Sequence, residues 1–87
     1  MQLGRIVGSA TSTVKDPRLT GAKLMLVQPV LPDGEEVGVP VVAEDAVGAG
    51  RGQLVLVVTG GSARDASRVP GAPVDAVIVA IVDAISI

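Results

Sequence analysis

Three short stretches of the chain are apolar at every position: residues 24–27, 54–58 and 76–82. Strands of this kind are buried on both faces, and in most proteins helices cover both faces of the sheet that contains them. Glycine and proline recur at short intervals here, which leaves little room for such helices. We therefore expect one face of each strand to fill a small barrel, while the other face needs a partner chain.

The rest of the sequence is typical of an all-β protein. Val and Ile account for 22 of the 87 residues, and β-branched side chains suit a pleated sheet. Turn signals separate five candidate strands, at residues 2–14, 23–31, 37–43, 53–59 and 74–85. Gly4 and Gly8 predict a bulge or a close backbone approach in the first strand. Ser62 and Asp65 have the spacing of a capping box, which predicts a helical turn over residues 62–67.

The size of the chain favours an assembly. We expect its 87 residues to form one domain, residues 1–87, and a domain this small buries only a modest share of its surface. No aromatic side chain enlarges the core, and no cysteine or histidine can staple it through a disulfide or a zinc ion. Oligomerisation is the remaining common source of stability. The size and the two-faced strands thus predict an oligomer independently.

The missing residue types also exclude several functions. Without His or Cys there is no catalytic triad, thiolate nucleophile or ordinary zinc centre, so we expect no enzyme activity, cofactor or metal. Without aromatic residues, and with a net charge of -2, the chain lacks the stacking platform and the basic surface of a nucleic-acid-binding protein. The longest apolar run is far shorter than the ~20 residues of a membrane span, so we expect a soluble, untargeted chain.

Two segments could carry binding chemistry. The GAGRG segment at residues 48–52 could aim backbone N–H groups at an anion, but its spacing matches neither the dinucleotide-binding motif nor the P-loop. A tight turn or close packing between subunits is the favoured interpretation. Ser62 and Arg64 could form an anion site at a helix N-terminus, although a cap and a surface arginine are favoured. The adjacent acids at 35–36 and 44–45 are interpreted as solvated turn charges.

Five segments in order, LGRIVGSATST, KDPRLTGAKLMLVQP, DAVGAGRG, GGSAR and PVDAVIVAIVD, resemble the EutN/CcmL family. The resemblance runs from Met1 to about residue 85. That family supplies the pentameric vertex proteins of bacterial microcompartment shells. The resemblance implies an all-β fold, a small five-stranded OB-like β-barrel with one short helix. It also implies a cyclic homopentamer that caps the five-fold vertices of a shell.

The same resemblance implies partners, a location and candidate surfaces. The partners would be hexameric and trimeric shell proteins, and the location the shell of a microcompartment in the bacterial cytoplasm. For the glycine loop we predict subunit packing or a place at the pore, through Gly48, Ala49, Gly50 and Gly52. Contact with other shell proteins, or a place at the pore, is predicted for Ser62, Ala63, Arg64, Lys15 and Arg18. The alternative is a small anion- or ligand-binding β-barrel module whose site combines the glycine loop with the Ser-Ala-Arg segment.

Overall fold

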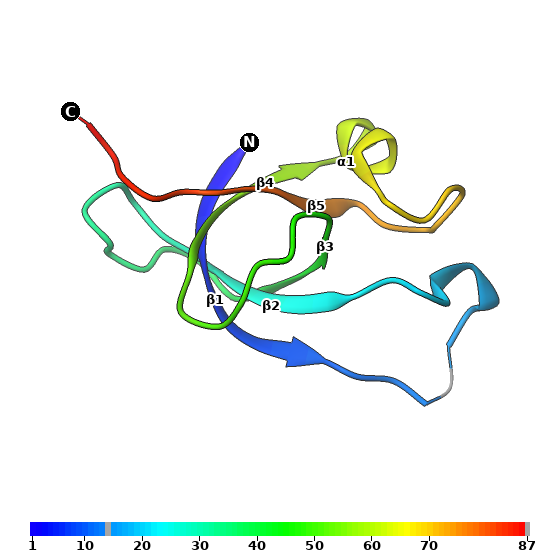
Figure 1. The fold of residues 1–87 in the computed structure, drawn as a ribbon. Helices are drawn as coiled ribbons and strands as arrows, with labels where there is room; N and C mark the ends of the chain where they lie inside the picture. Colours follow the sequence, from blue (N-terminus) through cyan, green and yellow to red (C-terminus); the bar gives the residue numbers. More distant parts are fainter. Residues whose placement is uncertain (14, 87) are drawn as a thin grey trace.

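The computed structural model describes residues 1–13 and 15–86. In this part of the chain the elements are β1 (Gln2–Ala10), the 3-10 helix η1 (Pro17–Leu19), β2 (Leu24–Pro29), β3 (Val41–Asp45), β4 (Leu54–Thr59), α1 (Gly61–Ala66) and β5 (Ala76–Ile81). The strands close into a barrel in the order β1-β2-β3-β5-β4 (Figure 1). The predicted five-stranded β-barrel with one short helix is confirmed.

The strands are shorter than the sequence predicted, because strands extend only where a neighbour is present to pair with them. β1 ends at Ala10, opposite Leu24, the first residue of β2. The predicted end of this strand, at residue 14, lies outside the described residues. β5 ends at Ile81, opposite Val55, and the next backbone bond, from Val82 N to Leu54 O at 2.8 Å, is made at the start of β4.

The core lies inside the barrel and confirms that one face of each strand fills it. Its largest members alternate along the strands, as the period of two requires: Ile6, Met25, Val27, Val55, Val57 and Ile78. At Gly4 the strands approach so closely that a Cβ atom would collide with the Val27 side chain. The predicted bulge lies between Ile6 and Gly8, where the pairing of β1 with β2 shifts register.

The shortest strand pairing in the barrel is between β3 and β5. These two strands run parallel and share two residue pairs, Glu44 with Val77 and Asp45 with Ile78. The preceding residues 41–43 pair with β2 on their other side. No helix among the described residues is long and apolar enough to cross a membrane.

Candidate functional site

The glycine loop, residues 48–52, packs beside β1. The backbone N–H of Gly52 donates to Ile6 O at 2.8 Å, and Ile6 N donates to Gln53 O at 3.0 Å. A third bond, from Gln53 N to Gly50 O at 3.1 Å, closes a tight turn. The predicted turn is therefore confirmed, whereas its role in subunit packing stays a prediction.

The small residues of this loop differ in whether the fold of one chain requires them to be small. Gly48 and Gly52 have φ angles of 79° and 87°, in the left-handed region that favours glycine. Gly50 has no such angle, and a Cβ atom there would meet only Gln53 Oε1, at 3.8 Å. Among the described residues, none would therefore collide with a Cβ atom at residue 50. Ala49 is 1% exposed, and its methyl group packs in the core of its own chain.

Asp45, the last residue of β3, holds the start of the loop. Its Oδ1 accepts hydrogen bonds from Val47 N and Gly48 N, both at 3.0 Å. Its Oδ2 lies 3.2 Å from Lys23 Nζ, which also donates to Ala49 O at 3.3 Å. Burial by itself would raise the pKa of Asp45, but the backbone N–H donors and the Lys23 ammonium together outweigh it. They hold the pKa of this carboxyl group below its usual value.

Glu44 fastens the segment that follows α1. Its side chain is buried, with Oε1 accepting from Ser67 Oγ at 2.5 Å and Oε2 accepting from Arg68 N at 2.8 Å. The prediction of solvated turn charges is thus wrong for Glu44 and Asp45, because both end a strand and find donors inside the fold. The same prediction is confirmed for the exposed pair at residues 35–36.

Helix α1 follows β4 almost directly and carries the Ser-Ala-Arg segment. Its N-cap is Gly60, with a φ of 69°, and no side chain caps it. The predicted cap at Ser62 is wrong, because the positive φ of Gly60 turns the chain straight into a helix that begins at Gly61. Ala63 is the fully buried residue of α1, whereas Ser62 and Arg64 are exposed. Of the three residues of the Ser-Ala-Arg segment, Ser62 and Arg64 are thus available to a partner and Ala63 is not.

The Lys15–Arg18 turn lies on the loop between β1 and β2, which reaches away from the barrel (Figure 1). Asp16 caps η1 by accepting from Arg18 N at 2.8 Å, and its carboxylate pairs with Arg18 Nη2 at 2.7 Å. The hydrogen bonds from Arg18 lower the pKa of Asp16 to about 2. Arg18 nevertheless stays exposed, so it remains available for the predicted contacts.

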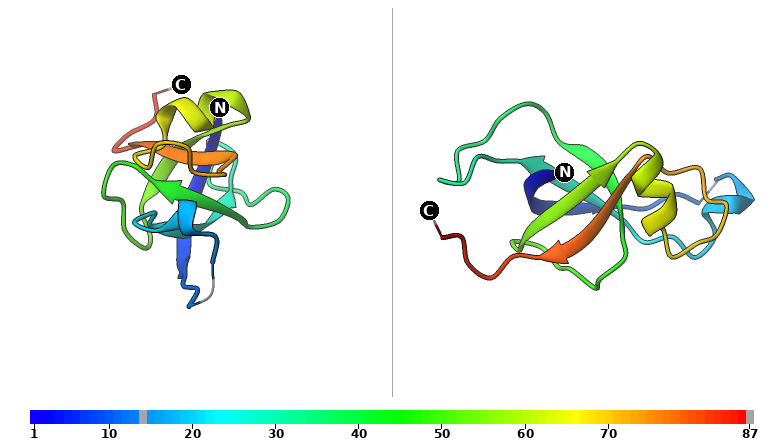
Figure 2. Two further views of the ribbon diagram at one scale, coloured as in Figure 1. Left: turned by 90° about the vertical axis from the view of Figure 1, so that its right-hand side faces the viewer. Right: turned by 90° about the horizontal axis from the view of Figure 1, so that it is seen from above.

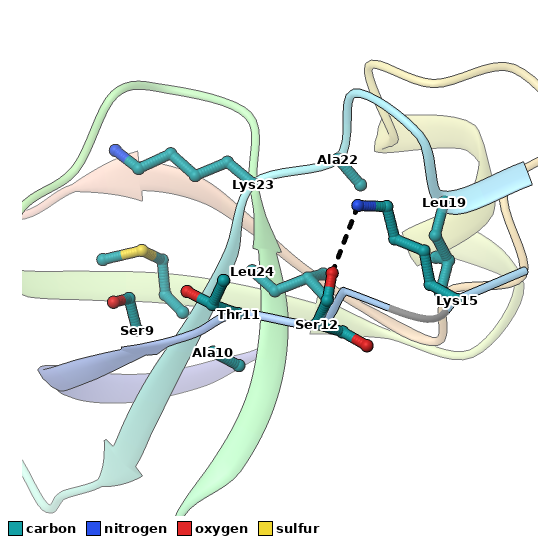
Figure 3. Close-up of a pocket in the computed structure, with 10 residues that line it drawn as sticks. Ser9, Ala10, Thr11, Ser12, Lys15, Leu19, Ala22, Lys23 and Leu24 are labelled. Carbon is teal, nitrogen blue, oxygen red and sulfur yellow. Dashed lines mark hydrogen bonds between the residues drawn. The ribbon is translucent and has the colours of Figure 1, made fainter. Parts of the chain in front are cut away.

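A cavity of about 560 Å³ lies beside this loop. Figure 3 shows its lining, which combines hydroxyl groups, two lysines and aliphatic side chains: Ser9, Ala10, Thr11, Ser12, Lys15, Leu19, Ala22, Lys23, Leu24 and Met25. The two ammonium groups do not converge. Lys15 Nζ bonds to Ser12 O at 3.4 Å, whereas Lys23 points away toward Asp45. The cavity therefore lacks the focused positive charge that an anion site needs.

The two segments of the alternative ligand site do not come together. Gly52 precedes β4 and Gly61 follows it, so a six-residue strand, roughly 20 Å long, lies between them. Among the described residues there is also no group of three or more acidic, His or Cys side chains that could hold a metal ion. The observed geometry thus points to surfaces rather than to a binding pocket.

Comparison with known proteins decides the family. Residues 1–83 match the family model described as "Ethanolamine utilisation protein EutN/carboxysome". The chain belongs to the EutN/CcmL family. It is 46% identical over 90 residues to the microcompartment shell vertex protein PduN of Salmonella typhimurium, and the match covers 99% of each chain. It is 42% identical to the carboxysome shell vertex protein CcmL of Thermosynechococcus vestitus, over 99% of this chain and 87% of that one.

Solved EutN/CcmL structures have the same fold. The chain superimposes on Gloeobacter violaceus CcmL with a TM-score of 0.92 at 38% identity, covering 100% of this chain and 90% of that one. It superimposes on the GrpN pentameric microcompartment shell protein of Rhodospirillum rubrum with a TM-score of 0.90 at 37% identity, covering 100% and 99%. These two relatives extend the likeness from the sequence to the whole barrel.

The sequence only partly indicated one exposed region of this EutN/CcmL member. Val39, Val41 and Val42 are 74%, 39% and 49% exposed. In the sequence they belong to the candidate strand 37–43, where Pro40 predicts a strand edge because it lacks a backbone N–H. That signal predicts an edge but not the exposure of the valine side chains beside it.

Proposed function

We propose that this chain is a structural shell protein whose homopentamer closes the five-fold vertices of a bacterial microcompartment. The observation that carries the proposal is the end-to-end match with PduN, which covers 99% of each chain. GrpN, a pentameric shell protein by description, is likewise matched over 99% of its length. Because the matched region covers almost the whole of PduN and of GrpN, it includes the part of each relative that carries its shell function.

The exposed surface of the single chain supports an assembly on physical grounds. The 8.7 kDa chain exposes 5287 Å². A monomeric protein of this mass typically exposes about 4,700 Å². The excess accompanies an elongated shape, 41 Å in its longest dimension, and a group of exposed valines beside β3. Burying such surface between subunits would supply stability that a core without aromatic residues lacks.

In this function the chain acts through contacts and does not catalyse a reaction or bind a cofactor. Its partners are further copies of itself and the hexameric and trimeric proteins of the shell, in the bacterial cytoplasm. The exposed polar side chains on two separate segments suit contacts with other shell proteins: Ser62 and Arg64 on α1, and Lys15 and Arg18 on the β1–β2 loop. The glycine loop suits subunit packing, since residue 50 needs no glycine within one chain.

Native mass spectrometry tests the proposed ring directly. Five chains of 8.7 kDa give an expected species of 43.5 kDa. A dominant species of that mass supports the vertex function, and a stable monomer across the micromolar range contradicts it. The method suits a chain without Trp or Tyr, which barely absorbs at 280 nm.

Closure of shells tests the vertex function itself. Shells from the same bacterium, made without this chain, should let small molecules escape, and adding the chain should seal them. Arg64→Ala should seal them less well if α1 contacts neighbouring shell proteins. Arg68→Ala, which changes another exposed arginine but keeps the backbone bond to Glu44, is the matched control. Equal sealing by the parent chain and Arg64→Ala would assign Arg64 to the free surface.

A further inference from the structure

The barrel is open at the end where β1 begins and where β2 and β4 end. Inward-facing side chains fill a small barrel, and two residues paired across strands share one face of the sheet. Gln2 pairs with the core residue Val57, and Val41 pairs with the core residue Val27. Gln2 and Val41 therefore face the barrel interior. Figure 2 (right) shows the start of β1 close to the ends of β2 and β4.

The side chains at this end leave the barrel interior uncovered. Val41 is 39% exposed although it points inward. The last inward-facing residues of β2 and β4, Pro29 and Thr59, are half-buried and exposed respectively. One layer deeper, Val27 and Val57 are only 1% and 2% exposed. The core is thus closed at the deeper layer and open at its last one.

A cavity of about 310 Å³ occupies this opening, which we call the barrel mouth. Its lining comprises Gln2, Val27, Pro29, Val41, Val57 and Thr59, together with Met1. The valines and the proline provide an aliphatic surface, and the polar side chains are those of Gln2 and Thr59. Gln2 Nε2 donates to Leu3 O at 3.0 Å, so its Oε1 can accept a hydrogen bond from a ligand. The Thr59 hydroxyl can both donate and accept.

This lining fits one small molecule that has an aliphatic chain and a hydroxyl group. Small-molecule sites are typically concave and mostly apolar, with a few polar groups that fix the orientation of the ligand. Among the described residues, no charged side chain lines the barrel mouth, so a carboxylate would lose water without gaining a charged partner there. An aliphatic cavity of about 150 Å³ already holds benzene, so the barrel mouth has room for a longer chain.

We propose that the barrel mouth binds a short primary alcohol of about four to six carbons. The alkyl chain lies on Val27, Val41 and Val57, and the hydroxyl group meets Gln2 and Thr59. Bound in this way, the alcohol supplies apolar volume to a core that has no aromatic side chain. The inference goes beyond the proposed function, because it concerns the interior of one barrel and not the contacts that a shell protein makes.

Methyl NMR of the assembled chain, labelled at its valines, tests the barrel mouth directly. On addition of n-butanol, the methyl signals of Val27, Val41 and Val57 should shift together and saturate, with a dissociation constant in the millimolar range. Val77 is 0% exposed but lies outside the barrel core, so its signals should stay in place. If the three signals do not saturate, the inference is wrong. The vertex function would still stand, since the mass of the assembly tests it separately.

Chain length and charge distinguish binding from a general effect of the solvent. From n-butanol to n-hexanol, each added methylene should tighten binding by about fourfold, the gain expected from burial of one methylene. Butyrate, which has the same chain length as n-butanol but carries a charge, should bind more weakly. Shifts that grow linearly at every valine would overturn the proposal, as would tighter binding of butyrate.

A matched pair of variants on β3 locates the site. Val41→Phe fills the barrel mouth and should abolish the saturable shifts of Val27 and Val57. Val42→Phe places the same ring on the outward face, at a residue that is 49% exposed, and should leave binding unchanged. Equal binding by these two variants would show that the alcohol lies elsewhere.

A third variant keeps the test decisive if Val41→Phe does not fold, which circular dichroism would reveal. Thr59→Val removes the hydroxyl group but retains the shape of the side chain and its preference for a strand. It should weaken the binding of n-butanol by about twofold to tenfold, the value of one hydrogen bond. An unchanged dissociation constant in Thr59→Val would overturn the proposed position of the hydroxyl group.

Discussion

The two ends of β3 reverse the usual relation between hydropathy and burial. At its start, Val41 and Val42 are 39% and 49% exposed, whereas at its end Glu44 and Asp45 are 1% and 6% exposed. Both carboxylates find donors within the chain, whereas the described residues cover the two valines only in part. The difference teaches that the acidic end is complete in one copy and serves the fold. The valine end leaves side chains exposed, of which the outward-facing Val42 would, under the proposed function, be covered by another copy.

Among the substitutions that test this comparison, removal of a buried carboxylate should lower the stability of the fold most. Glu44→Ala leaves the Arg68 N–H without its acceptor, leaves the Ser67 hydroxyl only Val69 O at 3.1 Å, and opens a small cavity. We expect the free energy of unfolding to fall by about 2–4 kcal/mol. Urea unfolding followed by circular dichroism, at one fixed protein concentration, measures it. Glu36→Ala, at an exposed position, should change it by less than about 0.5 kcal/mol, and equal losses would refute the contrast.

Acid should weaken the same end of the strand through Asp45. Because its pKa in the folded chain lies below the usual 3.8, ionised Asp45 stabilises the fold above that pH. This contribution is lost as the pH falls through the lowered pKa. Asp45→Asn should therefore cost about 1 kcal/mol at pH 7 and lose less Tm than the parent between pH 7 and pH 3. Equal Tm losses in the two proteins would show that Asp45 does not contribute.

The features that the sequence predicted are those set by neighbouring residues. Valine-rich runs, turn residues and the close approach at Gly4 depend on a few positions each, and they predicted short strands of a small barrel and a short helix. The resemblance supplied the five-stranded OB-like form of the barrel and the expected ring. The exposure of the valines at the start of β3 was not predicted, because Pro40 marks a strand edge but apolar neighbours give no sign of which side chains stay uncovered.

The acidic end of β3 could not be predicted for a related reason. The donors to Glu44 lie 23 and 24 residues further along the chain, and no local pattern links them to it. The helix start failed on a finer point, since the spacing of Ser62 and Asp65 fits a capping box but Gly60 already makes the turn. Long-range partners and backbone angles had to come from the structure.

Two substitutions in the glycine loop beyond Asp45 distinguish an effect on the fold from an effect on the ring. Gly48→Ala places a Cβ atom at a φ of 79°, so it should cost about 1–2 kcal/mol of stability. Gly50→Val meets no such strain within the chain, so its Tm as a monomer should change little. If the loop packs between subunits, Gly50→Val should instead lose the 43.5 kDa species in native mass spectrometry. A soluble Gly50→Val pentamer would remove this loop from the interface.

The smallest expected effect comes from Lys23, an exposed partner of the acidic end. The Lys23 side chain is 57% exposed, so water screens its ion pair with Asp45, and such pairs contribute about 0–1 kcal/mol. Lys23→Met should lower the free energy of unfolding by no more than this, even though it also loses the bond to Ala49 O. Urea unfolding beside Glu44→Ala compares the two. A loss as large as that of Glu44→Ala would mean that the lysine, and not the buried backbone donors, keeps the carboxylate of Asp45 inside the fold.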